Sequence, residues 1–434
     1  MSNLKITTNW VNSDENNILF AQTASNLQID VNGIPLTKNV NIWTRKVEDH
    51  IVVSTYPLAE WFAYYWWRLE NELMPGSHTE ITWRFAHEIG SANHGFVWPK
   101  VTFASDGEAM NIYSKVIAMP GQSVEYIGER DDVQTLPLTD FQKEVSAFIS
   151  STIERLGELP SELKELWHIV QEEISDPEKC IVRKIEAALG FDSEECPEDL
   201  LNKVFALQKQ VGNSSTKEVA PFLREESFRD GLLGVKGFSS SLSIPSDEIQ
   251  IDKTKNLLPW QEGVEIARQI RKKLHLGERP LVDSCLRDLL GISQKDFDAY
   301  GAMKDSLPVS VGKNANGSSL EIIPRAKPRN TGRRFELARL LGDAVINDSR
   351  KDEWLISSDY RSARQKRQRA FAAELLCPIN ALPINALEGY LNGDYSETKQ
   401  EAAADYFYVS DYTVKTLLVN YGRIEREAFM PCAI

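Results

Sequence analysis

Along residues 1–135 the spacing of apolar positions alternates between strand-like and helical, which predicts a mixed α/β domain. Four short apolar runs have the composition of strands: Leu4–Thr8, Leu27–Val31, Asn39–Thr44 and His50–Ser54. Asn32-Gly33, after the second run, is typical of a tight turn between antiparallel strands. Seven of the ten tryptophans lie in the first 98 residues, so we expect either an aromatic core or a wall on which a peptide could stack.

Two helices and a hairpin complete the expected elements of this domain. Between Leu58 and Glu72, apolar residues recur at the intervals of an amphipathic helix. Thr79 is a residue type favoured as an N-cap, so a second helix is expected from there to Ile89. Trp98–Ala104 and Ala109–Val116 alternate around a polar Ser-Asp-Gly-Glu turn and predict a hairpin.

Residues 136–232 are acidic and follow a helical period throughout. Four helices are expected: Phe141–Leu156, Ser161–Ser175, Pro177–Leu189 and Pro197–Gly212. No residue pattern there points to chemistry, so the region is interpreted as a spacer or an interaction bundle. Residues 233–258 are rich in serine and are interpreted as a linker.

Residues 259–434 predict a second compact domain that mixes helices with a small sheet, which makes the whole chain α+β. Its expected elements are helices at Gly263–Leu274 and Val282–Leu290, strands at Val309–Val311 and Leu320–Pro324, helices at Thr331–Ile346 and Ser362–Cys377, and a helix pair within Ala402–Gly422. Thr331 and Ser410 are the expected N-caps of two of these helices, and Gly422 is the expected end of the last.

Two of these helices carry a recognisable pattern. Phe335, Ala338 and Gly342 lie on the first, and Phe371-Ala372, Leu375-Leu376 and Pro378 lie on or just after the second. The pattern resembles the core of the ImmA/IrrE family of zincin-like metallopeptidases, over roughly residues 260–422. The resemblance implies a zincin-like domain that ends in a helix-turn-helix-like segment.

The residues that would carry the family's chemistry are different in this chain. Arg339 and Asp343 stand where the resemblance implies two zinc-binding histidines, and Leu340 stands where it implies the catalytic glutamate. Gln365 stands where it implies the third ligand, a glutamate. An arginine cannot ligate zinc and a leucine cannot accept a proton. We therefore expect an inactive pseudopeptidase with no metal or cofactor. Arg339 and Asp343 are expected to form an ion pair across the vacated position, with Glu336 able to share Arg339.

One alternative keeps a metal through histidines outside the motif. His87-Glu88 suggests a metallopeptidase helix, but residue 91 is serine where a second histidine is required. His94 and His275 are the other candidate ligands. An active peptidase would have to combine these histidines in the folded protein.

Charge is distributed unevenly along the chain, whose formal net charge is −14. Thirteen Lys or Arg and seven Asp or Glu lie between Glu321 and Ala370. Five of the bases form a cluster that could bind a partner: Arg361, Arg364, Lys366, Arg367 and Arg369. Arginine forks match carboxylates and phosphates, but the acidic net charge opposes nonspecific nucleic-acid binding. A protein or peptide partner is therefore expected, with a nucleic-acid-binding regulator as the alternative.

Cysteine usage and hydropathy bear on the cellular compartment. The five cysteines are scattered and never occur as Cys-x-x-Cys, which is typical of reduced thiols in a cytoplasmic protein. No run of about 18 apolar residues predicts a membrane span. Together with the resemblance, these features predict a regulatory binding protein, with a role in stress response or phage defence.

Overall fold

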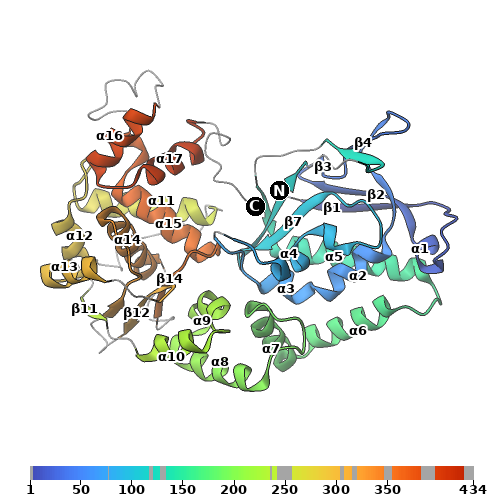
Figure 1. Cartoon of the computed structure of the whole chain (residues 1–434), viewed down its shortest axis with the longest axis horizontal. Helices are drawn as coiled ribbons and strands as arrows, with labels where there is room; N and C mark the ends of the chain where they lie inside the picture. Colours follow the sequence, from blue (N-terminus) through green and yellow to red (C-terminus); the bar gives the residue numbers. More distant parts are fainter. Residues whose placement is uncertain are drawn as a thin grey trace. The chain divides into compact units, whose positions relative to one another are not determined.

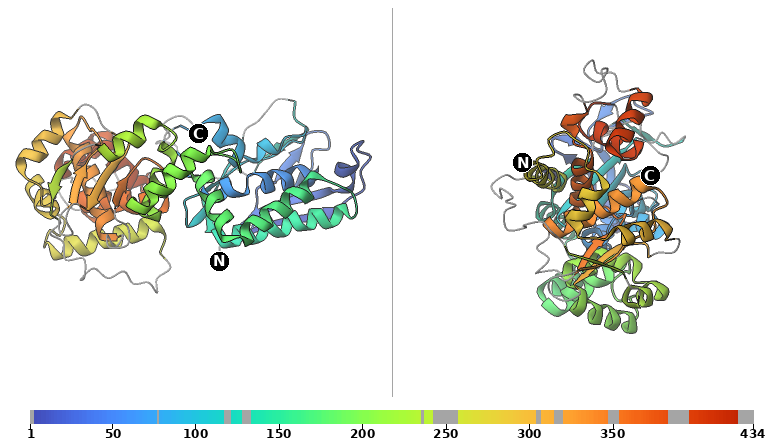
Figure 2. Two further views of the ribbon diagram at one scale, coloured as in Figure 1. Left: turned by 90° about the horizontal axis from the view of Figure 1, so that it is seen from below. Right: turned by 90° about the vertical axis from the view of Figure 1, so that its left-hand side faces the viewer.

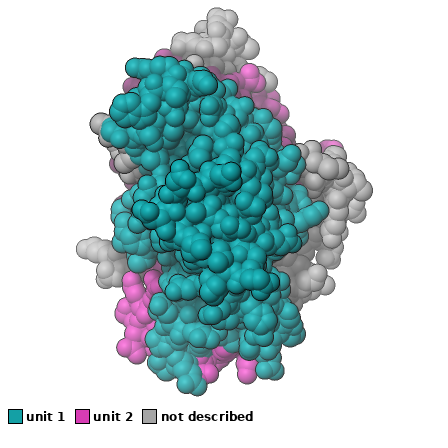
Figure 3. All heavy atoms as spheres, turned by 90° about the vertical axis from the view of Figure 1, so that its right-hand side faces the viewer, with its two compact units in different colours: residues 1–201 teal, residues 202–434 magenta. Residues whose placement is uncertain are grey.

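The structure is a computed structural model that describes residues 3–76, 78–116, 121–127, 133–234, 237–241, 257–303, 307–314, 320–346, 354–382 and 396–424. The chain forms two compact units, Met1–Leu201 and Asn202–Ile434, which Figure 3 distinguishes by colour. We call them the N-terminal and C-terminal units. Both combine helices with small antiparallel sheets, so the expected α+β class is confirmed. No described helix is long and apolar enough to cross a membrane.

The first sheet of the N-terminal unit is built around strand β2. Its strands are β1 (Leu4–Trp10), β2 (Ala24–Val31), β3 (Ile34–Pro35) and β6 (Ile51–Ser54), and β2 pairs antiparallel with the other three. The expected turn between β2 and β3 is confirmed. Asn32 and Gly33 both have positive φ, 55° and 77°, the backbone that a two-residue hairpin turn requires.

Two further sheets lie among the described residues of this unit, and Figure 1 labels one strand of each, β7 and β4. One orders β10 (Gln134–Pro137), β8 (Ala109–Lys115) and β7 (Lys100–Ser105); the other orders β5 (Val47–Glu48), β4 (Asn39–Asn41) and β9 (Val124–Tyr126). The expected hairpin is thus formed by β7 and β8. The Asp106 side chain accepts hydrogen bonds from the amides of Glu108 and Ala109, which holds the turn.

The helices of the N-terminal unit largely match their predictions. They are α1 (Ile18–Gln22), α2 (Tyr56–Tyr64), α3 (Trp66–Asn71), α4 (Ile81–His87), the short η1 (Ile89–Ala92), α5 (Leu138–Leu156), α6 (Glu162–Ser175), α7 (Pro177–Ala188) and α8 (Glu198–Val211), whose last ten residues belong to the C-terminal unit. Two details were wrong. The predicted Leu58–Glu72 helix is interrupted at Tyr65, and Thr79 does not cap α4, which begins after Glu80.

Aromatic residues and the middle helices build one core in this unit. Trp61, Phe62 and Trp66 are almost fully buried, and Phe62 packs against Phe103 and Phe148. Phe148 lies on α5, which also contacts β1 and α2. The acidic helical region therefore does not form a separate bundle: α5 to α7 pack in the N-terminal unit, and the remainder belongs to the C-terminal unit.

The C-terminal unit contains a four-stranded antiparallel sheet. Its order is β11 (Phe238–Ser240), β13 (Leu320–Ile323), β12 (Ser310–Asn314) and β14 (Trp354–Ser357). The sequence predicted β12 and β13 but neither edge strand. β11 falls inside the expected linker 233–258, most of which lies outside the described residues.

Helices of the C-terminal unit surround this sheet (Figures 1 and 2). They are α9 (Asn213–Val219), η2 (Ala220–Phe222), α10 (Glu226–Gly234), α11 (Pro259–Lys273), α12 (Asp283–Leu290), α13 (Gln294–Ala302), α14 (Asn330–Ile346), α15 (Ala363–Leu376), η4 (Ile379–Ala381), α16 (Glu397–Phe407) and α17 (Asp411–Asn420). Ser410 caps α17 by accepting a hydrogen bond from the Thr413 amide, as predicted. Thr331 is not an N-cap, because α14 already includes Asn330.

Two glycines allow three helices of this unit to approach closely. A Cβ on Gly342 of α14 would lie 2.5 Å from Cδ1 of Phe371 on α15, and a Cβ on Gly263 of α11 would lie 2.2 Å from the Arg367 carbonyl oxygen. Phe371 and Leu341 are fully buried, whereas Phe335, which also lies on the motif pattern, is half-buried. Both α14 and α11 pack on α15, and each contact is close because a glycine lies at it, Gly342 on α14 and Gly263 on α11.

Candidate functional site: a buried ion-pair network

The expected site residues lie on two adjoining helices beside strand β14. Glu336, Arg339 and Asp343 project from one side of α14, as their spacing of three and four residues requires. Ser362 begins α15 by accepting a hydrogen bond from the Gln365 amide, which places Gln365 in the first turn. All four side chains are buried.

Arg339 contacts both Gln365 and Glu336. Its guanidinium donates to Gln365 Oε1 at 2.6 Å and to the Ser358 carbonyl oxygen, and its Nη1 lies 3.5 Å from Glu336 Oε2. Arg339 is only 2% exposed. The Arg339 guanidinium therefore joins Glu336 on its own helix to Gln365 on α15.

Glu336 is held by a second arginine that the sequence did not suggest. Arg325 donates to both carboxylate oxygens, at 2.8 and 3.2 Å, and Ser310 Oγ donates at 2.5 Å. Burial alone would raise the pKa of Glu336. The nearby Arg339 and Arg325 outweigh this effect and lower the pKa to about 2. This carboxylate is therefore ionised at neutral pH and already bonded on both oxygens.

Asp343 pairs with Arg364 rather than forming the main ion pair predicted with Arg339. Arg364 donates to its two carboxylate oxygens at 2.8 and 2.7 Å, and the Ile356 amide donates to Oδ2 at 2.9 Å. Two parallel N–H···O bonds are the strongest geometry available to an arginine–carboxylate pair. Leu340, at the expected position of the catalytic glutamate, is 1% exposed and belongs to the hydrophobic core.

Gln365 links this network to α9. Its Nε2 donates to Glu218 Oε2 and to the Ile356 carbonyl oxygen, both at 2.9 Å, and Ser362 Oγ donates to Glu218 Oε1 at 2.6 Å. Burial raises the pKa of Glu218. Sequence reasoning missed Glu218 and Arg325, because neither lies in the motif and Glu218 is one acid among many in a helical region.

Most of the predicted basic cluster is not a free surface. Arg364 is 6% exposed and committed to Asp343, and Arg367 forms an ion pair with Glu262. Arg369 is half-buried and donates to the Tyr360 carbonyl oxygen at 3.0 Å. Arg361 and Lys366 are also half-buried and have interactions of their own. A continuous exposed basic face is therefore not formed by these five residues.

Side chains also occupy the outer edge of β14, where a peptide could otherwise add as a strand. The Ile356 carbonyl accepts from Gln365 and Gln368, and the Trp354 carbonyl accepts from Ser215 and Arg364. The amides of Ile356 and Ser358 donate to Asp343 and Gln365. Strand addition needs free backbone groups, so a peptide could pair here only by displacing this network.

The three histidines of the alternative metal site have separate structural roles. His87 is fully buried, stacked on Trp83, and hydrogen-bonded to the Phe103 carbonyl oxygen and to Glu72. His94 Nε2 lies 3.9 Å from Glu60 Oε2. His275 lies in the C-terminal unit just after α11, in a left-handed backbone conformation. Among the described residues, none of the three belongs to a group of three His, Cys, Asp or Glu side chains that could hold a metal.

The side chains at the position where the resemblance implies zinc do not fit that metal. Zinc requires about four nitrogen, sulfur or carboxylate ligands in a tetrahedron. Arg339 and Leu340 supply none, and both oxygens of Asp343 are occupied by Arg364. In the described part of the chain, no three His, Cys, Asp or Glu side chains are grouped so that they could hold a metal.

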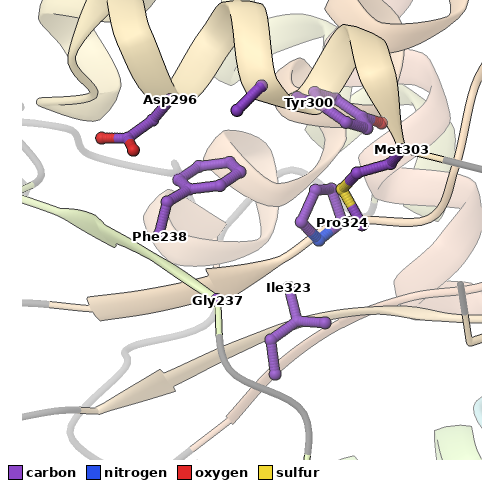
Figure 4. Close-up of a pocket in the computed structure, with 8 residues that line it drawn as sticks. Gly237, Phe238, Asp296, Tyr300, Met303, Ile323 and Pro324 are labelled. Carbon is purple, nitrogen blue, oxygen red and sulfur yellow. The ribbon is translucent and has the colours of Figure 1, made fainter.

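A pocket of about 190 Å³ opens elsewhere in the C-terminal unit, between α13 and the β11–β13 edge (Figure 4). Phe238, Tyr300, Met303 and Pro324 give it a largely apolar lining. The Tyr300 hydroxyl is already committed to the Arg325 carbonyl oxygen at 2.9 Å. Asp296 also lines the pocket, and its carboxylate accepts a hydrogen bond from Ser293 Oγ at 2.6 Å. One carboxylate in an apolar lining is not the convergent set of polar groups that would mark a catalytic site.

Comparisons with known proteins found no match: no family model, no curated protein and no solved structure is detectably similar to this chain.

Proposed function

We propose that this protein is a non-catalytic regulator that binds a partner protein, built on a degenerate ImmA/IrrE-like scaffold. One observation carries the proposal: the Arg339 guanidinium, buried and 2.6 Å from Gln365 Oε1, takes the place that the resemblance gives to a metal and its first ligand. The spacing of the site residues, the Gly342–Phe371 packing and the α14–α15 pair all support the scaffold.

The ion pairs argue against chemistry at this position. Glu336 and Asp343 are the carboxylates on α14 nearest to it, and both are bonded on each oxygen to arginines. A general base needs a free lone pair and access to a water. Neither carboxylate has both, which favours a structural role for the network and a binding role for the protein. A place in stress response or phage defence follows from the family analogy alone.

The mode of binding proposed here differs from peptide capture by a protease cleft. Because the outer edge of β14 is saturated by side chains, strand addition is disfavoured there. We infer that a partner contacts exposed side chains near the network instead.

The test of the non-catalytic assignment is zinc content. Wild-type protein equilibrated with zinc and then dialysed should hold well below one zinc per chain by elemental analysis. His94→Ala and His275→Ala serve as controls for the histidine alternative. Near-equimolar zinc in the wild type, lost in Asp343→Asn with an unchanged circular dichroism spectrum, would contradict the proposal.

The nucleic-acid alternative has its own readout. With a net charge of −14 and Arg364 and Arg367 committed to ion pairs, we expect no duplex DNA or RNA binding tighter than micromolar at physiological salt. A tight gel shift whose log affinity falls with log salt at about −0.9 per contacted phosphate would favour the nucleic-acid regulator. Arg367→Glu is the informative variant, since reversing the buried Arg364 would disturb the fold.

A further inference from the structure

Asp359 is an exposed carboxylate bound to buried arginines of the network. Its Oδ2 lies 2.7 Å from Arg325 Nη1, and its Oδ1 lies 3.8 Å from Arg339 Nη1. The Asp359 side chain is 68% exposed, whereas those of Arg325 and Arg339 are 7% and 3% exposed. An exposed aspartate, on the loop that joins β14 to α15, therefore contacts two guanidiniums that are themselves almost fully buried.

Asp359 lies beside more cations than anions. In the described part of the chain, Arg325, Arg339 and Arg369 lie near it, and Glu336 is the one other carboxylate that forms an ion pair with any of these three arginines. Burial and the neighbouring Arg339 lower the pKa of Arg369 to about 9, while Asp359 opposes that shift.

Donors for an incoming anion are available beside Asp359. Among the described residues, the one hydrogen bond of Arg369 goes to the Tyr360 carbonyl oxygen, and Arg339 Nε is buried with no acceptor. A guanidinium has five N–H groups arranged to match two carboxylate oxygens. The site therefore has unused donor capacity as well as excess charge.

A similar ion pair in the N-terminal unit shows that an exposed acid on a buried arginine is not sufficient. Arg183 pairs with three carboxylates, Glu173, Glu186 and Glu194, at 2.5 to 2.7 Å, and the Glu194 side chain is 78% exposed. Arg183 would still pair with Glu173 and Glu186 if Glu194 were removed, so no unbalanced positive charge would remain to attract another anion. Around Asp359 the balance has the opposite sign.

We propose that the place occupied by Asp359 is a carboxylate-binding site, formed by Arg325, Arg339 and Arg369, at which an acidic segment of a partner protein displaces Asp359. Asp359 is then a resident competitor that lowers the affinity for the external carboxylate. This inference rests on the proposed non-metal role of the network and names the chemistry of its ligand.

The test uses the full-length chain and an acidic peptide of alternating Glu and Asp, blocked at both ends, titrated by calorimetry at constant ionic strength. Asp359→Asn removes the resident charge at an exposed position. We expect it to bind the peptide at least about tenfold more tightly than wild type. Asp359→Asn combined with Arg369→Gln should lose that gain, and Glu194→Gln, the matched control, should bind as wild type does.

Two outcomes would overturn the proposal. The first is that Asp359→Asn binds the acidic peptide with the same affinity as the wild type and Glu194→Gln. The second is that Asp359→Asn binds inorganic phosphate more tightly than the peptide. If Asp359→Asn does not fold, the proposal is tested with the single variant Arg369→Gln, which must bind the peptide more weakly than the wild type. Zinc content is measured on the same preparations, so failure of the carboxylate site is distinguishable from failure of the non-catalytic assignment.

Discussion

Glu70 and Glu336 are both buried carboxylates, yet their surroundings shift their pKa values in opposite directions. Glu336 has two arginines nearby and a pKa of about 2. Glu70 in α3 is 6% exposed, and its Oε1 has no hydrogen-bond partner among the described residues. Burial raises the pKa of Glu70 to about 7. Ion pairing, rather than burial alone, decides whether a carboxylate stays charged in these cores.

Replacing Glu70 with Gln should stabilise the N-terminal unit in a pH-dependent way. The folded pKa lies above the unfolded value of 4.5, so the folded state binds more protons and loses stability as pH rises from about 4.5 to 7. At pH 7.5 the gain from Glu70→Gln should be roughly 3 kcal/mol, and below pH 4 it should vanish. Urea unfolding at several pH values measures this.

The control for that prediction is Glu125→Gln, the same change at an exposed position. It should alter the unfolding free energy little at any pH. If the two substitutions have equal effects, or if the effect of Glu70→Gln does not change with pH, burial does not raise the pKa of Glu70 in the folded protein.

The Asp343–Arg364 pair should be costly to break from either side. Asp343→Asn and Arg364→Ala each remove one charge of this buried pair, and each should lower the unfolding free energy by about 3–5 kcal/mol. The double variant should lose about 0.5–3 kcal/mol less than the sum of the singles. Strict additivity in denaturant titrations would indicate that the pair is not coupled.

At the scale of elements, Gly342 and Gly263 allow α14 and α11 to pack closely against α15. Gly263→Ala should cost more than Gly342→Ala, because the first Cβ would meet a backbone carbonyl and the second a phenylalanine ring that can shift. We expect about 1–3 kcal/mol for Gly342→Ala and at least as much for Gly263→Ala. Thermal unfolding of the two variants gives the comparison.

Gly332→Ala is the matched control for the helix-packing prediction. Gly332 lies in the first turn of α14, and its nearest neighbour would be 3.5 Å from the new Cβ. Helix propensity alone should then make the change neutral or stabilising by up to about 1 kcal/mol. If all three substitutions have the same sign and size, close helix contact does not explain the glycines.

At the scale of the whole molecule, each unit has a core of its own. Phe62 lies in the core of the N-terminal unit and Phe371 in that of the C-terminal unit, and both are fully buried. Phe62→Ala and Phe371→Ala should each destabilise one unit by about 3–5 kcal/mol. Calorimetry should show that each lowers a different thermal transition. A single transition that both variants shift equally would mean that the units unfold together.

The sequence by itself determined most helices and the central strands, because their apolar residues repeat at 3.6 or 2 positions whatever the rest of the chain does. The grouping of Arg339, Asp343 and Gln365 came from the resemblance to a known motif, which implies that these three positions lie close together. It did not predict the edge strands β11 and β14, which are only three and four residues long.

Only the tertiary structure decided which charges pair. Arg325 reaches Glu336 across 11 residues of sequence and Glu218 reaches Gln365 across 147, so no local pattern could reveal either partner. Arg364, expected on a surface, is buried because Asp343 and the Trp354 carbonyl oxygen offer it acceptors inside the fold. Periodicity shows which face of an element is buried, whereas the partner of a buried charge depends on which elements meet there.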